Sequence, residues 1–401
     1  MTYTIRVAAA SIGLGILAGC YEIAPTEVPV SIQQAESTQT PPSDLSQIDT
    51  LVQGEIAQGH FPGAVVLVGQ GDKTLYYKAF GNSVSQPFQE PMQQDTVFDI
   101  ASLSKPVGTA TSVLILVEQG KIHLEDEVAK YLPAFACSGK EKVQIKHLLS
   151  HTSGLPAYTD AAAISSEFGP VCPDKVLDKI CSLKALNEPG ATFRYSCLGY
   201  ITLGRIVEIV SDQPLDAFAR DNIFVPLGMT STRYNPPPLW RERIAAATLQ
   251  GDVLLRGNVH DPLAALMGGV SGNAGIFSTA QDLAAFCRML LNDGQGNGPR
   301  ILGSESVTLL TSEQALGRAY GFDVSSSYAG MKGDYPNPKA FCHSGYTGTS
   351  IVCDPDAKVF IIILTNRVHP DDKGSVGSLR KEIATIVGRW VSRQENEGIQ
   401  N

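Results

Sequence analysis

The stretch Ser102-Leu103-Ser104-Lys105 places a hydroxyl three residues before an amine. Residues three apart lie on one face of a helix, so Lys105 can reach the Ser102 oxygen if the segment forms the first turn of one. A lysine amine beside a serine hydroxyl is one way to activate a nucleophile. Because serine and lysine are common, the same pattern also fits an exposed pair at a helix start, and the surrounding sequence must decide between the two.

Composition and charge limit the classes of partner. The 401 residues are 43% hydrophobic and 18% charged, which is enough apolar content to bury a large core. The net charge is −9, and Lys and Arg form no run. Nucleic-acid binding needs a basic face for the phosphates, so we expect no nucleic-acid partner. A small-molecule or peptide substrate fits this composition better.

The first twenty residues have the features of a targeting segment. Arg6 precedes an apolar run from Val7 to Leu17 that is too short to span a bilayer, and small residues then lead to Cys20. The sequence Leu17-Ala18-Gly19-Cys20 resembles the lipobox of bacterial lipoproteins. This resemblance implies a lipoprotein signal peptide over residues 1–20 and lipidation of Cys20. An ordinary secretory signal that is cleaved nearby is the alternative.

Residues 21–45 contain several Pro, Gln and Ser residues and almost no large apolar residue after Ile32. We interpret this segment as a flexible tether, which as a coil of two dozen residues would span roughly 25 Å. Signal and tether together predict an exported protein, lipid-anchored to a bacterial membrane and facing the periplasm or the cell exterior. The membrane is therefore an expected partner.

Cysteine and histidine patterns give no metal signal. Seven cysteines follow Cys20, and an odd number leaves at least one thiol unpaired within the chain. No C-x-x-C pair occurs, so zinc is not indicated. His147 and His151 have helical i, i+4 spacing but lack the glutamate of the H-E-x-x-H motif, and we interpret both as structural. The sequence predicts neither a metal nor a cofactor.

Apolar runs separated by turn residues lie near both ends of the chain, which is the pattern of paired strands. The last of these runs is apolar throughout, as expected for a central strand covered on both faces. We predict strands over 64–69, 75–81, 349–353 and 359–364, turns at 70–73 and 354–357, and a closing helix over 378–391.

The middle of the chain carries helix signals instead. A continuous apolar-rich segment runs from Ser102 to Glu118 and stops before Gly120, a favoured C-cap residue. Thr279 followed by Asp282 forms a capping box before another apolar segment, and Tyr200 to Val210 is a third helix. We therefore predict an α+β fold: an antiparallel β-sheet built from both chain ends and flanked by helices, with a mainly helical insert.

Six blocks, in order along most of the mature chain, extend the pattern around Ser102. They are Phe98-Asp99-Ile100-Ala101-Ser102-Leu103-Ser104-Lys105, Ile145-Lys146-His147-Leu148-Leu149-Ser150-His151-Thr152-Ser153-Gly154-Leu155-Pro156, Phe193-Arg194-Tyr195-Ser196, Pro226-Leu227-Gly228-Met229, Gly275-Ile276-Phe277-Ser278-Thr279-Ala280, and His343-Ser344-Gly345 followed by Thr347-Gly348. These blocks resemble the serine β-lactamase and penicillin-binding protein superfamily. They are closest to its class C β-lactamase-like branch, which also holds family VIII carboxylesterases and D-alanyl-D-alanine peptidases.

The resemblance implies a β-lactamase/transpeptidase-like fold with a single catalytic domain over 46–395. Its α/β part would span about 46–100 and 335–395, and its helical part about 101–334. A lone S-x-x-K pattern is a weak signal, whereas six ordered blocks are a strong one. The resemblance therefore favours a reactive Ser102 over an incidental surface pair.

The resemblance also implies roles for three residues. Ser102 would be the nucleophile, and either Lys105 or Tyr195 the base, a choice that stays open. Unsatisfied backbone N–H groups at the helix start would stabilise negative charge that develops there. Partial burial beside a second hydroxyl would leave the Lys105 amine neutral often enough to accept a proton. A core position for Tyr195 is the alternative.

The segment His343, Ser344, Gly345 and Tyr346 would form the opposite wall of the site. By the same resemblance, the oxyanion hole would be the backbone N–H of Ser102 and of Tyr346. Small residues here would let a substrate lie against the strand as an added strand does. His343 would orient a substrate carboxylate or support Tyr195, with a purely structural histidine as the alternative.

Three cysteines near these motifs carry separate expectations. Cys197 stands where the family commonly has the amide of a Y-x-N motif, which would hydrogen-bond a substrate carbonyl and the lysine. A thiol is a much weaker partner, which argues against efficient β-lactam hydrolysis more than against acyl transfer; a buried filler role is equally open. Cys342 and Cys353 would lie opposite each other if the chain turned at Thr347-Gly348, so a disulfide is geometrically possible.

These observations predict an exported serine hydrolase that forms an acyl-enzyme on Ser102. The expected activity is that of a D-alanyl-D-alanine carboxypeptidase/peptidase or related amide hydrolase acting on a peptidoglycan stem peptide. A family VIII-type carboxylesterase acting on an ester and a class C-like β-lactamase acting on a β-lactam are the alternatives among enzymes. A catalytically inactive peptidoglycan-binding protein is the alternative of another class, although Ser102, Lys105 and Tyr195 are all present.

Overall fold

The computed structural model describes residues 42–398, apart from residues 252 and 297. The predicted signal peptide, Cys20 and most of the predicted tether lie outside the described residues. The described part belongs to one compact unit. None of its helices combines the length and the apolar character needed to cross a membrane.

The folded body includes the last residues of the predicted tether. The 3-10 helix η1 (Ser43–Ser46) leads directly into α1 (Gln47–Ala57). Leu45 is fully buried and packs in the same hydrophobic cluster as Ile48. Because its side chain is covered by the core, Leu45 is a structural residue and not part of a solvated coil.

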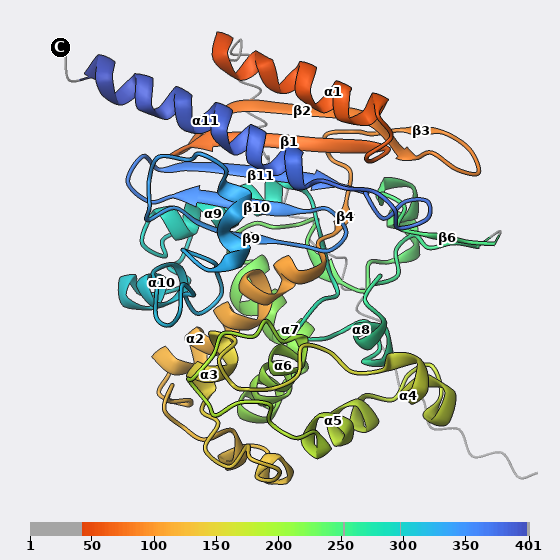
Figure 1. The fold of residues 1–401 in the computed structure, drawn as a ribbon, viewed down its shortest axis with the longest axis vertical. Coiled ribbons are helices and arrows are strands. Elements are labelled where there is room, and N and C mark those ends of the chain that lie inside the picture. Colours follow the sequence, from red (N-terminus) through yellow and green to blue (C-terminus); the bar gives the residue numbers. More distant parts are fainter. Residues whose placement is uncertain (1–41, 252, 297, 399–401) are drawn as a thin grey trace, which may run out of the picture. The chain divides into compact units, whose positions relative to one another are not determined.

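A six-stranded antiparallel sheet joins the two ends of the chain, as predicted (Figure 1). The strand order is β3-β2-β1-β11-β10-β9, so the N-terminal strands pair with the C-terminal ones and β9 lies at an edge. Its strands are β1 (Gly63–Gln70), β2 (Lys73–Val84), β3 (Glu90–Pro91), β9 (Phe341–Ser344), β10 (Ser350–Asp354) and β11 (Val359–Thr365).

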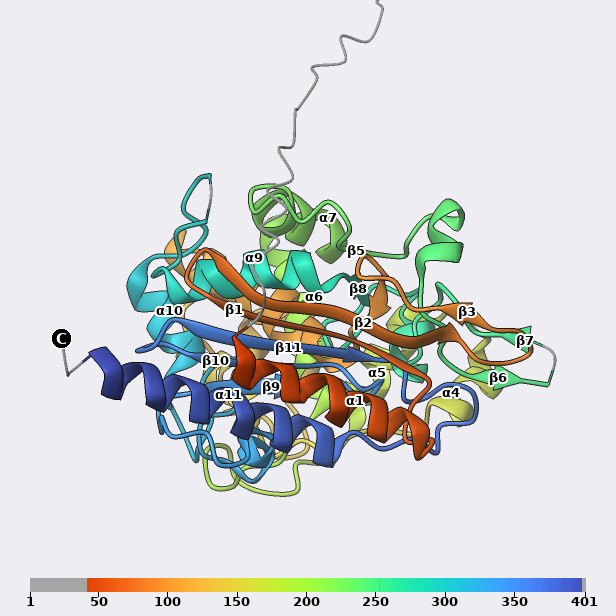
Figure 2. The ribbon, with the colours of Figure 1, turned by 90° about the horizontal axis from the view of Figure 1, so that it is seen from above.

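The sheet separates two hydrophobic cores. In β1, Val65 and Leu67 belong to the larger core, whereas Ala64 and Val66 belong to the smaller one. Successive strand residues face opposite sides, so a strand that is covered on both faces needs apolar side chains throughout, which explains the sequence of β11. Helices α1 and α11 (Gly377–Gly398) lie side by side on the smaller core (Figure 2), and α9 (Ala280–Leu291) packs on the other face.

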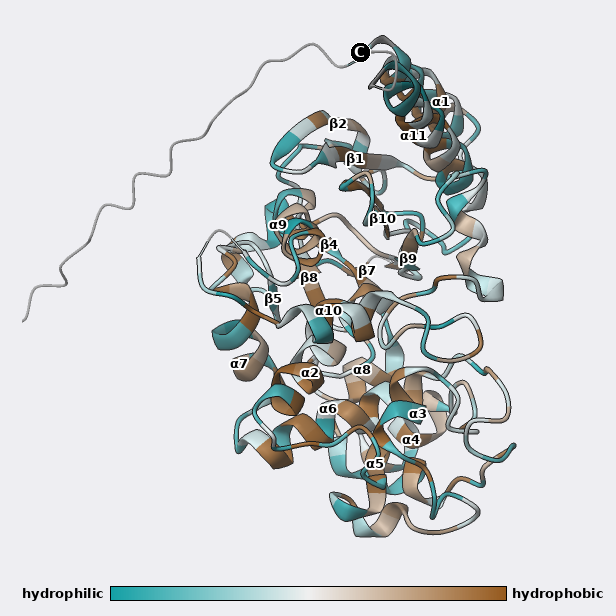
Figure 3. Cartoon of the chain, turned by 90° about the vertical axis from the view of Figure 1, so that its left-hand side faces the viewer, coloured by the Kyte–Doolittle hydropathy of each residue, from teal (hydrophilic) through white to brown (hydrophobic). Residues whose placement is uncertain are grey.

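The helical part lies between β3 and β9 in sequence and is centred on α2 (Thr111–Glu118) and α6 (Cys197–Ser211), whose side chains are mostly apolar (Figure 3). Its other α-helices are α3 (Ile145–Leu149), α4 (Ala161–Phe168), α5 (Pro173–Ser182), α7 (Leu215–Ala219), α8 (Pro262–Leu266) and α10 (Ser304–Thr311). Shorter turns are η4 (Val128–Lys130), η5 (Pro133–Phe135), η6 (Arg220–Phe224), η7 (Pro238–Arg243) and η8 (Ser327–Lys332).

Two small sheets complete the architecture. One has the order β4-β8-β5 and brings β4 (Phe98–Asp99), just before Ser102, against β8 (Ile276–Ser278). The backbone N–H of Ile100 also donates to the Ile276 carbonyl, at 3.0 Å. The remaining strands are β5 (Arg233–Tyr234), β6 (Leu249–Gln250) and β7 (Val253–Leu254).

The predicted helix from Ser102 to Glu118 is continuous, but its first half is not a regular α-helix. The 3-10 turn η2 (Ala101–Leu103) is followed by a π-helical segment, η3 (Lys105–Ala110), before α2 begins. Pro106 lies in η3 and has no backbone N–H to donate to a regular α-helical ladder. Such π segments are frequent at functional sites.

The disulfide that the sequence left possible between Cys342 and Cys353 does not form. Cys342 pairs with Val352 and Cys353 pairs with Phe341, because the turn is centred on Thr347 and not between Thr347 and Gly348. A shift of one residue reverses the face on which a side chain lies. Cys342 accordingly packs in the smaller core and Cys353 in the larger one, and both thiols are free.

Candidate active site

The backbone just before Ser102 adopts an unfavourable conformation. Ala101 has φ of 47°, in the left-handed region that residues other than glycine seldom occupy. The buried Asp99 side chain accepts hydrogen bonds from the backbone N–H of Ala101, at 2.8 Å, and of His260, at 2.7 Å. These bonds hold the turn in a strained conformation that presents Ser102 at the start of η2.

The turn between β9 and β10 packs tightly against this strained segment. The Thr347 hydroxyl donates to the Asp99 carbonyl at 2.7 Å, and the Thr349 hydroxyl donates to the Ile100 carbonyl at 3.0 Å. A Cβ atom at Gly345 would lie 2.4 Å from the Ile100 oxygen, so the approach requires glycine. The edge strand of the sheet is thereby fixed beside Ser102.

Lys105 reaches the Ser102 hydroxyl, as the spacing predicts. Its Nζ lies 3.0 Å from Ser102 Oγ and 2.9 Å from the Asn273 carbonyl oxygen, and 3.6 Å from Cys197 Sγ. The Lys105 side chain is completely buried. The structure therefore places the amine of Lys105, a candidate base, beside the predicted nucleophile Ser102. The same amine lies beside Cys197, the residue at which the chain differs from the family motif.

Burial and the neighbouring groups act in opposite directions on the pKa of Lys105. Burial does act to lower the pKa of Lys105, but the neighbouring Cys197 and Tyr195 groups outweigh it, and the pKa lies above its ordinary value. When it carries a proton, Lys105 must lose it before it can serve as a base.

Tyr195 lies where the resemblance places it. Its ring is 5.1 Å from Lys105 Nζ and is stacked between His151, with centroids 4.3 Å apart, and Tyr328 of η8, at 5.1 Å. Burial raises the pKa of Tyr195, and contacts with Lys105 and a hydrogen bond with Ser102 only partly oppose this effect. Tyr195 is therefore a neutral phenol that faces both the nucleophile and the amine.

Two buried histidines flank Tyr195 and differ in tautomer. His343 Nδ1 lies 3.0 Å from the Ser344 carbonyl oxygen and must be its donor, so its Nε2 carries only a lone pair. His151 Nδ1 accepts from the Ser196 N–H at 3.1 Å, so its Nε2 carries a proton. Neither Nε2 atom has a hydrogen-bond partner among the residues that the structure describes.

Both rings are uncharged at neutral pH. Burial, and then the charge of the buried Arg318, lowers the pKa of His151 and of His343 well below its ordinary value. A neutral His343 whose Nε2 only accepts cannot bind a carboxylate. The expected role of orienting a substrate carboxylate therefore does not fit this tautomer, whereas accepting a hydrogen bond does.

The two N–H groups predicted for the oxyanion hole lie in η2 and in the turn after β9. Within the described part of the chain, no backbone hydrogen bond uses the N–H of Ser102 or of Tyr346. Ser344 and Gly345 lie between His343 and Tyr346 and lead out of β9 into the turn. The Tyr346 side chain is exposed and stacks on His260, with ring centroids 5.6 Å apart, so it borders the site from outside.

Several residues of the site escaped the sequence-based interpretation. His151 was interpreted as structural but stacks on Tyr195, and Asp99 supports the Ser102 turn although it lies inside the first motif block. Asn273 contacts Lys105 from two residues before the block that begins at Gly275. Proximity to the ordered blocks is the one signal that could have singled them out.

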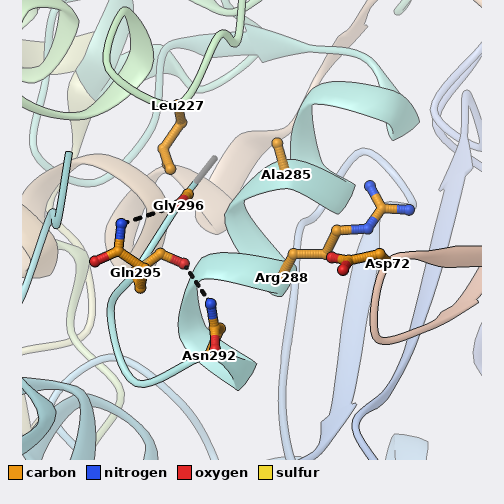
Figure 4. A pocket seen from close by; sticks show the side chains of 7 residues that line it. All are labelled: Asp72, Leu227, Ala285, Arg288, Asn292, Gln295 and Gly296. Atoms are coloured by element: carbon orange, nitrogen blue, oxygen red, sulfur yellow. Dashed lines mark hydrogen bonds between the residues drawn. The ribbon is translucent and has the colours of Figure 1, made fainter. Parts of the chain in front are cut away.

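A separate depression lies beside α9 (Figure 4). Two of its polar side chains are already hydrogen-bonded: Arg288 donates to the Gly71 carbonyl and Asn292 to the Gln295 carbonyl, each at 3.2 Å. None of the residues predicted for the site lines it. The lining residues are Asp72, Leu227, Ala285, Arg288, Asn292, Gln295 and Gly296.

No cluster of three or more His, Cys, Asp or Glu side chains suited to a metal ion occurs in residues 42–398, leaving aside 252 and 297. The groups around Ser102 are a hydroxyl, an amine, a phenol, a thiol and neutral imidazoles. This donor set suits acyl transfer to a hydroxyl, with proton movement between the amine and the phenol.

Comparison with known proteins places the chain among relatives that share this architecture. The family model described as Beta-lactamase matches residues 48–385. An N-acetylmuramyl-L-alanine amidase from Bacillus subtilis is 30% identical over 92% of this chain and 92% of its own. An Escherichia coli protein named "Putative D-alanyl-D-alanine carboxypeptidase" is 31% identical over 81% of this chain and 82% of its own.

Solved structures show the same fold at lower identity. EstCE1, a hydrolase with promiscuous acyltransferase activity, has a TM-score of 0.69 and 24% identity, over 86% of this chain and 98% of its own. A penicillin-binding protein homologue from Caulobacter crescentus has a TM-score of 0.68 and 22% identity, over 88% of this chain and 99% of its own. With the family match over residues 48–385, these findings show that the chain belongs to the beta-lactamase family of serine hydrolases.

Proposed function

We propose that the chain hydrolyses an amide or ester through an acyl-enzyme on Ser102. The observation that carries this proposal is the 3.0 Å contact between Lys105 Nζ and Ser102 Oγ. The free backbone N–H groups of Ser102 and Tyr346 add the donors that an oxyanion needs. The nucleophile, the proton acceptor and one oxyanion donor thus come from residues 102–105, and the second oxyanion donor comes from the turn after β9.

The reaction needs a neutral proton acceptor beside Ser102. In the fraction of molecules in which Lys105 has lost its proton, Ser102 Oγ attacks the substrate carbonyl and its proton passes to Nζ. The Tyr195 phenol lies within reach of both groups and relays that proton to the departing amine or alcohol, so the acyl-enzyme ester forms as the old bond breaks. Water then attacks the ester by the same route in reverse, and carboxylate and Ser102 are released.

A peptidoglycan stem peptide is the substrate that we propose first. Two relatives that match more than four-fifths of the chain are named for cell-wall amide chemistry, one as an amidase and one as a carboxypeptidase. The edge strand β9 lies beside Ser102. On its outer side Cys342 pairs with Asp323, and no described strand of the sheet pairs with Ser344 there. An extended peptide could add to such an edge through backbone hydrogen bonds.

A carboxylesterase is the second candidate, and the tautomer of His343 favours it. A D-alanyl-D-alanine substrate carries a carboxylate next to the scissile bond, whereas His343 is neutral and offers only a lone pair. An ester of an alcohol carries no such charge. A peptide cleaved away from its C-terminus would also fit a neutral His343. The two candidates therefore differ in whether the site binds a terminal carboxylate.

Release of D-alanine from a pentapeptide ending in D-Ala-D-Ala, compared with hydrolysis of a p-nitrophenyl ester, separates these candidates. We expect both activities, if present, to disappear in Ser102→Ala. D-alanine release that depends on Ser102 would support the peptidase. Ester hydrolysis without D-alanine release would replace it by the carboxylesterase. Binding of muropeptides without either turnover would favour the inactive binding protein.

We also propose that the protein is exported and anchored through Cys20. The support is the N-terminal pattern of one basic residue, a short apolar run and Leu17-Ala18-Gly19-Cys20, followed by the proline-rich segment. Labelling cells with an alkyne fatty acid should mark the unsubstituted protein and leave Cys20→Ser unmarked. Equal labelling of both proteins, or retention of both in the cytoplasm, would contradict the anchor.

A further inference from the structure

His151 follows the end of α3 at a position where glycine is the usual residue. Its φ is 58°, in the left-handed region. The His151 N–H donates to the Leu148 carbonyl at 3.3 Å, and the Thr152 N–H donates to the His147 carbonyl at 2.8 Å. This pair of bonds is a Schellman motif with His151 as its left-handed residue. Glycine adopts that conformation without strain, so the helix end alone does not explain a histidine here.

Burial makes the choice of histidine more costly still. His151 is only 1% exposed, and its Nε2 has no hydrogen-bond partner among the described residues. A phenylalanine ring would offer the same apolar faces without an unpaired polar atom, which native cores rarely contain. Core packing therefore does not explain the imidazole either. What remains is the bond made by its other nitrogen, Nδ1, and the rings that it contacts.

The segment that carries Tyr195 depends on tertiary contacts for its position. Residues 193–196 belong to no helix or strand, so their backbone N–H groups need partners from elsewhere in the chain. His151 supplies two of these partners. Its carbonyl accepts from the Arg194 N–H at 2.9 Å, and its Nδ1 accepts from the Ser196 N–H at 3.1 Å. One residue thus binds the backbone on both sides of Tyr195.

The same imidazole also lies against the Tyr195 ring. The two rings are stacked, with centroids 4.3 Å apart and planes 30° apart. Tyr328, which is exposed, stacks on Tyr195 as well, at 5.1 Å. The His151 ring is itself supported by Tyr200, at 4.9 Å, whose hydroxyl donates to the Leu149 carbonyl at 2.9 Å. His151 is therefore the buried and fixed side of the stack that holds Tyr195.

We propose that His151 is a positioning residue that holds Tyr195 in the orientation needed to deliver a proton to the leaving group. In that step the phenol proton passes to the leaving oxygen as the bond to the acyl carbon breaks, and the phenolate recovers a proton from Lys105. His151 transfers no proton itself, because its Nδ1 is occupied by the Ser196 N–H. The inference rests on the acyl-enzyme proposed for Ser102 and on the proton relay through Tyr195.

Two substitutions separate the two contacts of the imidazole. His151→Asn places Oδ1 as many bonds from the backbone as Nδ1, and asparagine tolerates the left-handed conformation, so the acceptor stays and the stacked ring is lost. His151→Phe keeps a ring and loses the acceptor. The backbone bond between the His151 carbonyl and Arg194 is untouched by both changes. His147→Asn is the matched control, because His147 Nδ1 also accepts a backbone N–H, that of Gln144 at 3.1 Å, at the start of α3.

A comparison of two esters tests the role in proton delivery. The alkoxide that leaves ethyl butyrate needs a proton, whereas p-nitrophenolate leaves p-nitrophenyl butyrate without one. We expect His151→Asn to lower kcat/KM about tenfold or more for the ethyl ester and less than about threefold for the p-nitrophenyl ester. A smaller folded fraction would lower both values by one factor, so their ratio reports the positioning. His147→Asn should change the ratio by less than about twofold.

Two results would overturn the proposal. One is an unchanged ratio in His151→Asn, which would reduce the residue to a structural role. The other is an unsubstituted protein that hydrolyses the p-nitrophenyl ester and not the ethyl ester, since no proton would then reach the leaving group.

Hydrogen exchange tests the backbone contact without turnover. The peptide that holds the Ser196 N–H, measured relative to a peptide of β11, should exchange about tenfold faster in His151→Phe, because this donor loses its acceptor. In His151→Asn its rate should stay within about twofold of the unsubstituted protein. Equal exchange in His151→Phe and the unsubstituted protein would contradict the contact.

Labelling of Ser102 separates this inference from the proposed function. If Ser102 of the unsubstituted protein fails to react with a fluorophosphonate, the acyl-enzyme proposal falls, and the role of His151 in catalysis falls with it. If Ser102 reacts and His151→Asn leaves the ester ratio unchanged, only the inference on His151 falls.

Discussion

Asp99 connects the strained backbone before Ser102 to the wall of the site. Its carboxylate is buried and accepts from two backbone N–H groups, those of Ala101 and His260. Removing such an acceptor leaves buried donors unpaired, which costs about 1–3 kcal/mol for each group. The backbone of Ala101, with its positive φ, then loses a stabilising hydrogen bond. The Ser102 hydroxyl can therefore move away from Lys105.

Asp99→Ala should therefore lower the free energy of unfolding by about 2–5 kcal/mol and reduce the rate of Ser102 acylation. The matched control is Asp95→Ala, since the Asp95 side chain is 70% exposed and its ion pair with Arg243 lies at the surface. That change should stay within about 0.5 kcal/mol. Urea unfolding together with fluorophosphonate labelling measures both effects. Equal stability and equal labelling of the two variants would show that Asp99 does not support the turn.

The charge state of Lys105 leads to a prediction about pH. The pKa of Lys105 and that of Tyr195 are both raised, so the proton acceptor is scarce at neutral pH and becomes more abundant as pH increases. Between pH 7 and 9 we expect kcat/KM for an ester to rise by about tenfold per pH unit, after subtraction of the Ser102→Ala rate. His151 and His343 have lowered pKa values and should add no step between pH 6 and 8. A plateau reached below pH 7 would indicate a histidine base instead.

At the scale of elements, the β9–β10 turn and the η2 turn fit together through Gly345. A Cβ atom there would lie 2.4 Å from the Ile100 oxygen and 2.2 Å from Thr349 Oγ1, so backbone would have to move. The next residue, Tyr346, supplies one of the two proposed oxyanion donors. Loss of one such donor typically lowers kcat by about 10²–10³-fold.

Gly345→Ala should accordingly lower kcat by about 10²-fold or more and the free energy of unfolding by about 1–3 kcal/mol. Gly54→Ala is the control, because Gly54 lies in α1 and a Cβ atom there meets nothing within 4 Å. That change should preserve kcat and raise stability by about 0.5–1 kcal/mol. Ester hydrolysis and urea unfolding of the two variants test the contrast. Full activity of Gly345→Ala would remove the proposed link between the turn and the oxyanion hole.

At the scale of the whole molecule, one sheet forms a wall of both hydrophobic cores. Residues of β1, β10 and β11 alternate between the core under α1 and α11 and the core shared with the helical part. The helical part cannot keep its core closed once these strands separate. The described body should therefore unfold in a single cooperative transition.

The two tryptophans report on this cooperativity. Trp390 lies in α11 within the smaller core, and Trp240 packs on a cluster beside the helical part. Trp240→Phe and Trp390→Phe each leave a single tryptophan. In each variant, the fluorescence transition and the circular dichroism transition should have the same urea midpoint. Fluorescence and circular dichroism transitions that separate within one variant would show that the two cores unfold independently.

The sheet, its pairing from both chain ends and the contact of Lys105 with Ser102 were predictable from the sequence, since they depend on apolar periodicity and on fixed spacing. The π-helical segment that contains Pro106 and the register at Thr347 were not, because one proline or one residue of turn changes them without changing the apolar pattern. The stacking of His151 on Tyr195 and the contact of Asn273 with Lys105 join residues about 44 and 168 positions apart. Such contacts depend on tertiary packing that a local pattern does not contain.

Intact-protein mass spectrometry after brief exposure to an ester, a penicillin or a D-Ala-D-Ala peptide tests the central claim most directly. We predict an increase in mass equal to the acyl group, located by peptide mapping on Ser102, for at least one of these compounds. The adduct should be absent in Ser102→Ala and should form more slowly in Lys105→Ala. An adduct that persists in Ser102→Ala, or turnover of any of these compounds by that variant at the unsubstituted rate, would contradict an acyl-enzyme on Ser102.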